Sequence, residues 1–387
     1  MDWSSHAARL AGDTTSPRSR WRDVVECVPR HVFVPRWWQR GVPLPGPYGT
    51  AEWTGISGPA DPAAWMSAAY SDRTLVTRVG PDHADDADPG QTVTGAPTSS
   101  ATLPSLLVQM FRHAEIEDQS HVLDVGTGSG YGAALLAARL GDEKVTTVDL
   151  DSYLVAAAAD RLDRAGFRPK TLMADATCSL PGTYDRIVAT MSVRPIPVSW
   201  LDALQPGGRL VTTIAGTGLI LVADTAPDGG AEGRIVWDRA GFMAARPAGS
   251  AYPDYPRRVA AIMDAYVSEG DLRVSRYPMV CVPEAWELWS MLGVESPGIE
   301  YDYREENGVR TAVMVHPDGS WARATAAAQG GPVHVWQGGP RRLWDLVDEL
   351  RERWLRDGSL PVYGARARVE PDGRIVLRRG SWTATLD

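Results

Sequence analysis

The sequence predicts an α/β protein built on a doubly wound, mostly parallel sheet with an antiparallel edge hairpin, followed by a C-terminal α+β region. Three observations predict this fold. Short β-branched runs alternate with helical patterns through the middle of the chain, and the last two runs are separated only by a turn-rich segment. None of the fifteen tryptophans lies between Trp65 and Trp200, so the middle of the chain differs in composition from its flanks.

The middle region begins with a buried strand and a glycine-rich turn. HVLDVG at 121–126 has the composition of a parallel strand, and GYGAALLAARLG at 130–141 has helical spacing of apolar residues with a closing glycine. A second helix is expected at 154–166. Further strands are expected at 144–149, 170–175, 184–190 and 206–216, and the edge hairpin at 219–224 and 233–238. This alternation is typical of a doubly wound sheet.

The residues before the middle region are predicted to be helical at first and irregular afterwards. The Pro/Gly-rich segment 42–62 has the composition of irregular surface chain, and the acidic, turn-rich segment 79–95 has that of a loop. Together with the middle region they form the first predicted domain, residues 1–246.

The second predicted domain is residues 247–387, which begin with the linker-like PAGSAYPDYP. A short aromatic helix is expected at 284–293 and an amphipathic helix at 341–358. One face of the amphipathic helix carries Trp344, Val347, Leu350 and Trp354. The region is predicted to be a substrate-recognition or accessory domain, because its aromatic side chains could line a recognition surface: Trp286, Trp289, Trp321, Trp336, Trp344, Trp354 and Tyr363. Because Trp344 and Trp354 have helical spacing, we expect these two in the core of the region instead.

Composition excludes several classes of function. The chain has 387 residues and a net charge of −9, which disfavours a nucleic-acid partner. Cys27, Cys178 and Cys281 lie far apart, so neither a disulfide framework nor a metal site is expected. No apolar run reaches the length of a signal peptide or the ~18 residues of a membrane span, which predicts a cytoplasmic protein without a membrane partner. The sequence does not indicate an oligomeric state.

The glycine-rich turn is the candidate cofactor site. Its glycines follow the spacing GxGxG rather than the GxGxxG of dinucleotide enzymes, and they lie after Asp124. Asp149 ends the next strand, where a carboxylate can accept the two ribose hydroxyls, and Asp151 could substitute for it. Asp175 ends the strand after that. Glycines alone also occur in tight turns without a ligand, but acidic residues at successive strand ends indicate a nucleotide-type cofactor.

Four segments carry a resemblance to a known family. VLDVGTGSGYGAALLA resembles the S-adenosylmethionine motif of class I methyltransferases, in the GTGSGY form of the protein-L-isoaspartate O-methyltransferase family. VPRHVFVP at 28–35, YSDRTL at 70–75, and YDRIVAT followed by IPVSWLDALQPGGRLV resemble other parts of that family. The resemblance covers roughly residues 20–246. It implies the class I S-adenosylmethionine-dependent methyltransferase fold, with S-adenosyl-L-homocysteine as the product of the cofactor.

The resemblance also implies which residues bind the cofactor. Asp149 would hold the ribose, and Asp175 and Ala176 would border the adenine. The glycine-rich turn at Gly126–Gly130 would run alongside the methionine part of the cofactor. The full implied set is Asp124, Gly126, Thr127, Gly128, Ser129, Gly130, Asp149, Leu150, Asp175 and Ala176.

A carboxylate acceptor is already ionised at neutral pH, with a pKa of about 4, so no general base is required. The family places an orienting hydroxyl in a Ser-x-Pro pattern, where this chain has Thr102 before Pro104, with Ser99 and Ser100 upstream. These three hydroxyls are the catalytic candidates. Thr102 is equally suited to cap the helix that follows.

The VPRHVFVP segment supplies the substrate-side candidates Arg30, His31 and Val32. Arg30 could pair with an acceptor carboxylate or form an internal ion pair, and His31 could instead be a packing residue. Cys178 is expected to be a packing residue rather than a nucleophile.

VDLDSYL at 148–154 and SVRPIPVSW at 192–200 resemble the homologues that accompany lanthipeptide and graspetide biosynthesis in actinobacteria. Those relatives also carry a C-terminal extension. The resemblance implies that the acceptor is an aspartate in a ribosomally made, enzymatically cyclised precursor peptide, and that its ester closes to an aspartimide and then hydrolyses in some cases to isoaspartate. Three alternatives remain: a repair enzyme for isoaspartyl residues, a cofactor-binding protein without catalysis, and a nicotinamide oxidoreductase.

Overall fold

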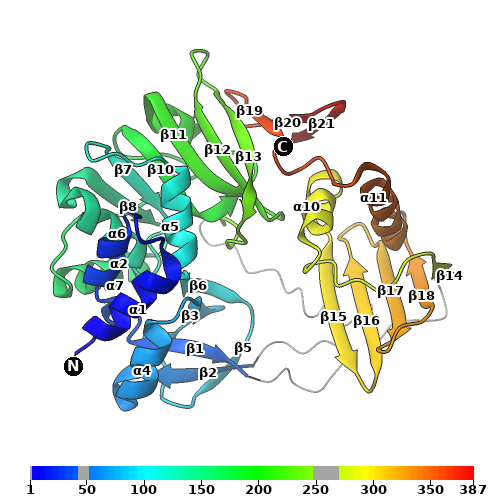
Figure 1. Ribbon diagram of the computed structural model, residues 1–387, viewed down its shortest axis with the longest axis horizontal. Coiled ribbons are helices and arrows are strands. Elements are labelled where there is room, and N and C mark those ends of the chain that lie inside the picture. The colour runs from blue at the N-terminus through cyan, green and yellow to red at the C-terminus, as the bar shows by residue number, and fades with distance from the viewer. Residues whose placement is uncertain (1, 42–51, 247–269) are drawn as a thin grey trace.

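The computed structural model describes residues 2–41, 52–246 and 270–387, which form three sheets and the helices around them (Figure 1). The largest sheet has ten strands in the order β21-β20-β19-β13-β12-β11-β10-β7-β8-β9. Its parallel part comprises β7 (Val122–Val125), β8 (Val145–Asp149), β9 (Lys170–Met173), β10 (Tyr184–Val193) and β11 (Leu204–Ile214). The predicted class I methyltransferase fold, with a mixed sheet, is confirmed.

Helices cover both faces of this sheet. Neighbouring residues of a strand point to opposite sides, so a strand with apolar residues throughout needs a core on each face. Val122 belongs to the core under α5 and α6, whereas Leu123 belongs to the core of the other face. The helices of this part are α5 (Pro104–His113), α6 (Tyr131–Leu140), α7 (Ser152–Arg164) and α8 (Val198–Ala203). All four residues of β7 are buried, as expected for a central parallel strand.

The antiparallel part of the sheet differs from the prediction. The hairpin of β12 (Leu219–Thr225) and β13 (Ala231–Arg239) is present, but it does not form the edge. β13 pairs with β19 (Arg366–Val369), and the sheet continues through β20 (Ile375–Arg379) and β21 (Trp382–Leu386). The sequence placed every residue after 246 in a C-terminal region, whereas this pairing puts 366–386 in the sheet of the first domain.

The N-terminal part carries more regular structure than predicted. Helices α1 (Ser4–Thr14), α2 (Arg22–Cys27) and α3 (Arg30–Phe33) precede a six-stranded sheet with helix α4 (Pro62–Ala69). The strands are β1 (Arg36–Arg40), β2 (Glu52–Ser57), β3 (Leu75–Val79), β4 (Asp82–His83), β5 (Thr92–Thr94) and β6 (Pro97–Ala101).

The predictions of irregular chain at 42–62 and of a loop at 79–95 are therefore wrong where the structure describes them. Residues 42–51 lie outside the described residues. This N-terminal sheet has a small core of its own around Trp38, Trp53 and Val79. The high Pro, Gly and Asp content of the two segments gave no indication of these strands.

The five-stranded sheet lies in the C-terminal region together with α10 (Trp286–Glu295) and α11 (Leu343–Asp357) (Figure 1). Its strands are β14 (Asp271–Ser275), β15 (Glu300–Glu306), β16 (Val309–Val315), β17 (Trp321–Ala327) and β18 (Val333–Gly338). Trp344 is buried as predicted, but Trp354 is 44% exposed, so the prediction of a core role for Trp354 is wrong. The last turn of α11 lies beside α10, where the Trp354 indole donates to Glu287 instead of packing on the sheet. The predicted linker at 247–256 lies outside the described residues.

Helix α10 also contacts the ten-stranded sheet. The Arg194 guanidinium donates to the Gly293 carbonyl at 2.8 Å, and a Cβ at Gly293 would overlap the Gly216 carbonyl oxygen. Gly293 therefore lets α10 lie directly on the β11–β12 turn. Among the described residues, no helix is both long and apolar enough to cross a membrane.

Candidate active site

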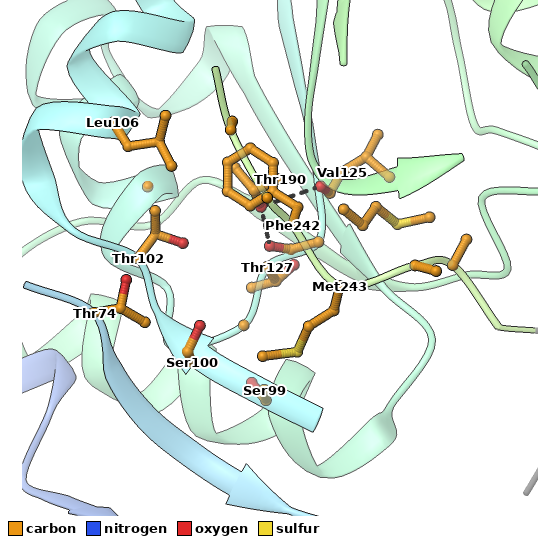
Figure 2. Close-up of a pocket in the computed structure, with 18 of the residues that line it drawn as sticks. Thr74, Ser99, Ser100, Thr102, Leu106, Val125, Thr127, Thr190, Phe242 and Met243 are labelled. Carbon is orange, nitrogen blue, oxygen red and sulfur yellow. Dashed lines mark hydrogen bonds between the residues drawn. The ribbon is translucent and has the colours of Figure 1, made fainter. Parts of the chain in front are cut away.

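A cavity of about 1200 Å³ opens at the carboxyl ends of β7 and β8 (Figure 2). Nine of the ten predicted cofactor residues line it: Asp124, Gly126, Thr127, Gly128, Ser129, Asp149, Leu150, Asp175 and Ala176. Gly130 does not. Instead, Gly130 begins α6 with a φ of 89°, and a Cβ there would lie 3.2 Å from Ala158 of α7. Its role is therefore close helix packing.

The turn after β7 requires its first two glycines. Gly126 and Gly128 have φ values of 97° and 51°, which side chains with a Cβ rarely adopt. A Cβ on Gly126 would also approach the Thr190 hydroxyl to 3.1 Å. That hydroxyl donates to the carbonyls of Gly126 at 3.0 Å and Val125 at 3.4 Å, which fixes the turn against β10 (Figure 2).

Asp149 is held by two backbone donors. Its Oδ2 accepts from Gly128 N–H at 3.0 Å and its Oδ1 from Asp151 N–H at 3.2 Å. Burial raises the pKa of Asp149 above its ordinary value. Asp151 cannot substitute for it, because the Asp151 carboxylate caps α7 and pairs with Arg78 at 2.6 Å.

Asp124 is fully buried at the wall of the cavity. Thr147 Oγ1 donates to its Oδ2 at 2.8 Å, while Oδ1 has no hydrogen-bond partner within the described part of the chain. Burial raises the pKa of Asp124 to about 7. A buried carboxylate oxygen without a hydrogen-bond partner destabilises the fold. Because this oxygen lies at the cavity wall, a cationic group of a ligand could supply the missing hydrogen bond.

Asp175 and Ala176 lie together past the end of β9. The Asp175 carboxylate accepts from the Thr177 N–H and hydroxyl at 2.9 and 2.6 Å, and these hydrogen bonds hold the pKa of Asp175 below its ordinary value. The Ala176 carbonyl accepts from Trp200 Nε1 at 2.8 Å. Cys178 is exposed, so the prediction of a packing role is wrong; it follows the end of the strand rather than lying inside the sheet.

Hydroxyl groups line the opposite part of the cavity. Figure 2 shows the hydroxyls of Thr74, Ser100 and Thr102 turned toward the same space. Among the described residues, none of these three hydroxyls has a hydrogen-bond partner in the protein, whereas Ser99 Oγ accepts from Thr77 Oγ1 at 3.1 Å. Sequence reasoning identified Ser99, Ser100 and Thr102 but missed Thr74, which has no pattern of its own.

Thr102 does not cap the helix that follows it. Leu103 is the N-cap residue of α5, and no side chain at that position caps the helix. The Asp72 carboxylate accepts from Ser105 N–H at 2.9 Å instead. The Thr102 hydroxyl therefore remains available to the cavity.

Two further segments complete the wall, of which sequence reasoning missed Phe242 and Met243 but named Trp286 and Trp289 as candidates for a recognition surface. Phe242 and Met243 follow β13 and lie across the space from the hydroxyls (Figure 2). Their backbone is fixed, because Ser192 N–H donates to the Met243 carbonyl at 2.9 Å. Trp286 and Trp289 of α10 also line the cavity, so the C-terminal region contributes to it. The clustering of tryptophan after Trp200 was the only sequence signal for this contribution.

Arg30, His31 and Val32 do not line the cavity. Arg30 is fully buried and donates to the carbonyls of Ala69, Ser71, Arg73 and Thr102 at 2.7 to 3.2 Å. Both terminal nitrogens are occupied by backbone carbonyls, and the buried Nε faces no partner among the described residues, so the predicted pairing with an acceptor carboxylate is wrong. His31 Nδ1 lies 2.7 Å from the Tyr70 hydroxyl, and Val32 packs against the N-terminal core. Both are packing residues.

The described residues contain no group of three or more His, Cys, Asp or Glu side chains placed to hold a metal ion.

Comparison with known proteins identifies related chains. Residues 69–229 match the family described as protein-L-isoaspartate(D-aspartate) O-methyltransferase. The protein-L-isoaspartate O-methyltransferase of Thermococcus onnurineus (strain NA1) is 36% identical over 136 residues, which cover 34% of this chain and 59% of the relative. That of Methanoculleus marisnigri (strain ATCC 35101 / DSM 1498 / JR1) is 30% identical over 190 residues, 48% of this chain and 65% of the relative. The chain thus spans about three fifths of these relatives.

This chain is also similar to solved structures, among them the following two. One, described as a protein-L-isoaspartate O-methyltransferase, has a TM-score of 0.48 and 16% identity, and the match covers 100% of this chain and 99% of that one. The other is a putative enzyme of the same description from Plasmodium falciparum in complex with S-adenosyl-L-homocysteine, with a TM-score of 0.42 and 14% identity, over 64% of this chain and 99% of that one.

Proposed function

We propose that this chain is an S-adenosylmethionine-dependent carboxyl O-methyltransferase, because residues 69–229 match the protein-L-isoaspartate O-methyltransferase family. One observation carries the proposal. A single cavity joins the glycine turn and the carboxylates of Asp124 and Asp149 to the free hydroxyls of Ser100 and Thr102. The first group suits the cofactor, and the second suits an acceptor carboxylate.

The residues present fit S-adenosylmethionine. The Asp149 carboxylate, fixed by two backbone N–H groups, can accept the ribose hydroxyls. The free Oδ1 of Asp124 can accept from the ammonium group of the methionine part. A Cβ on Gly128 would lie 3.4 Å from the Ser100 carbonyl, so the glycine keeps this narrow side of the cavity open. When bound, the cofactor supplies a methyl group carried on a sulfonium.

The chain's own residues have two tasks in such a reaction. The hydroxyls of Thr102 and Ser100 donate to the acceptor carboxylate and hold one oxygen in line for attack. The side chains of Phe242 and Met243 cover the opposite side of the same space and exclude water from it (Figure 2). No side chain has to remove a proton, because the acceptor is already ionised.

For the substrate we propose an aspartate of a ribosomally made, enzymatically cyclised peptide. The resemblance at 148–154 and 192–200 supports this choice, and so does the contribution to the cavity of α10, which lies outside the matched residues 69–229. In the methyl ester, the amide nitrogen of the following residue attacks the carbonyl carbon. The new N–C bond forms, the ester C–O bond breaks, and methanol leaves with the amide proton, giving an aspartimide.

A repair methyltransferase acting on isoaspartyl residues of damaged proteins is the second candidate, favoured by the names of the curated relatives. Incubation with S-adenosylmethionine distinguishes the two candidate functions. The test substrates are the linear and the cyclised form of a candidate precursor peptide, and an isoaspartyl peptide. Mass spectrometry should show the gain of one methylene and then the net loss of one water on the cyclised peptide alone. Methylation of the isoaspartyl peptide alone would support repair instead.

A further inference from the structure

A second cavity of about 460 Å³ lies between α10 and α11; we call it the α10–α11 groove. Its floor includes Leu288, Leu350 and Leu360, which are 6%, 3% and 1% exposed. Trp354 and Leu355 on its rim are 44% and 60% exposed, although both are large apolar side chains. Apolar surface of this kind on a monomer is characteristic of a binding site.

The groove is preformed. Trp354 Nε1 donates to Glu287 Oε2 at 2.6 Å, which joins the last turn of α11 to α10 and orients the indole. The Arg351 guanidinium lies 4.9 Å from the centre of the Tyr277 ring and closes the other side. These contacts fix the positions of the walls, so the groove is present without a ligand.

The groove adjoins the candidate active-site cavity. Glu284 and Trp286 line both cavities. Trp286 is fixed between the Arg239 guanidinium, 4.9 Å from its ring, and the Tyr363 ring at 4.8 Å. Trp286 therefore separates the two cavities by the width of one side chain row, and a peptide with its acceptor carboxylate at Thr102 can extend past Trp286 toward the groove.

We propose that the α10–α11 groove binds a large apolar side chain of the same peptide that places its carboxylate in the active-site cavity. This inference rests on the proposed function for the identity of the substrate. The groove has room for one or two side chains, and charged residues such as Glu352, Arg356 and Asp357 are exposed around it. A stable dimer would bury about 800 Å² on each partner, far more than this small apolar patch offers.

The first test measures binding directly with N-acetyl-L-tryptophanamide as the probe. Indole signals of ¹⁵N-labelled protein are assigned with Trp354→Phe and Trp286→Phe. We expect the Trp354 and Trp286 signals to shift saturably in the wild type and at least tenfold more weakly in Leu355→Glu. Absence of a saturable shift, or equal shifts in Leu355→Glu, would overturn the proposal.

Leu272→Glu provides a matched control, because Leu272 on β14 is also 60% exposed and lies outside both cavities. The control should bind the probe as the wild type does. Equal loss in both variants would show a general effect of added charge and would contradict a specific groove.

The second test uses the cyclised peptide that the wild type methylates. Leu355→Glu should raise KM at least tenfold relative to Leu272→Glu. When the apolar side chain nearest the acceptor aspartate in that peptide is replaced by glycine, wild type and Leu355→Glu should have the same KM. If Leu355→Glu leaves KM for the original peptide unchanged, the proposal that the groove binds the peptide is contradicted. If the wild type methylates no aspartyl peptide, the proposed function is contradicted, and the probe-binding test alone decides whether the groove is a binding site.

Discussion

The backbone N–H of Gly128 donates to Oδ2 of Asp149 across 3.0 Å, and so ties the turn after β7 to the carboxyl end of β8. A carboxylate has about four acceptor positions, of which this hydrogen bond and the one from Asp151 N–H occupy two. The remaining positions are available to two hydroxyl groups. The position of Asp149 is therefore set before any ligand binds.

Removing this carboxylate should weaken binding of the cofactor. Hydrogen bonds to a charged group contribute about 1.5–3 kcal/mol each, so Asp149→Ala should raise the Kd of S-adenosyl-L-homocysteine by at least ~10-fold. Isothermal titration calorimetry measures this change. Asp160→Ala is the control, because Asp160 is 69% exposed on α7 and forms only a 3.6 Å surface ion pair with Arg164. The same Kd for both variants would contradict the assignment.

The buried Asp124 should make stability depend on pH in one direction. Its pKa is about 7 in the folded protein and about 3.9 in the unfolded chain, so between these values only the folded protein retains the proton. The contribution of Asp124 to the free energy of unfolding therefore falls as pH rises through this window and is constant above it.

Asp124→Asn removes that titration. The free energy of unfolding of the variant relative to the wild type should rise by about 2–3 kcal/mol between about pH 5 and about pH 8. Urea unfolding at the two pH values measures it. A difference that stays constant with pH would show that Asp124 does not hold a proton in the folded protein.

The hydroxyl of Thr102 should affect catalysis more than cofactor binding. Thr102→Val keeps the shape of the side chain but removes the donor, so kcat should fall about 10- to 100-fold. Thr102→Ser should retain kcat within a few-fold. Steady-state methyl transfer measures kcat, and the Kd of S-adenosyl-L-homocysteine should be unchanged in both variants. If Thr102→Val keeps full kcat, orientation of the acceptor belongs to Ser100 or Thr74.

Arg30 should matter for stability rather than for the substrate. Its guanidinium satisfies four backbone carbonyls inside the protein, and Arg30→Met would leave them without donors. We expect the free energy of unfolding to fall by about 3 kcal/mol or more, measured in urea. Arg164→Met, at a 58% exposed position, should have little effect. An Arg30→Met variant of normal stability with a raised peptide KM would contradict this role.

The local parts of the site could be predicted from the sequence. Strand, glycine turn and helix follow one another directly, and Asp149 ends the next strand along the chain, so the pattern itself indicates Gly126, Gly128 and Asp149. Phe242 could not be predicted, because it reaches the cavity from the end of β13, and for Trp286 the sequence indicated a recognition surface but not the docking of α10 on a distant turn that brings it to the cavity. Arg30 was wrongly assigned to substrate binding, because a sequence motif identifies a residue but does not show which groups its side chain contacts in the folded protein.

Periodicity has a related limit. The helical spacing that predicted Trp344 in the core also predicted Trp354 there, yet spacing says nothing of where the covering sheet ends. The pairing of β19 with β13 was missed for a similar reason. Alternating residues near 366–369 predict a strand, but many strands in the chain could have been its partner.

The pairing of β13 with β19 makes residues 270–365 an insertion within the ten-stranded sheet rather than an appendage to it. Cutting the chain after residue 246 would remove β19 from the edge of β13. The backbone N–H and C=O groups on that edge would then be exposed, and exposed strand edges favour edge-to-edge aggregation. A chain cut there would lose both the α10 side chains that line the cavity and the strand that covers the edge of β13. Completion of the cavity wall and protection of the sheet edge thus both depend on residues that follow residue 246.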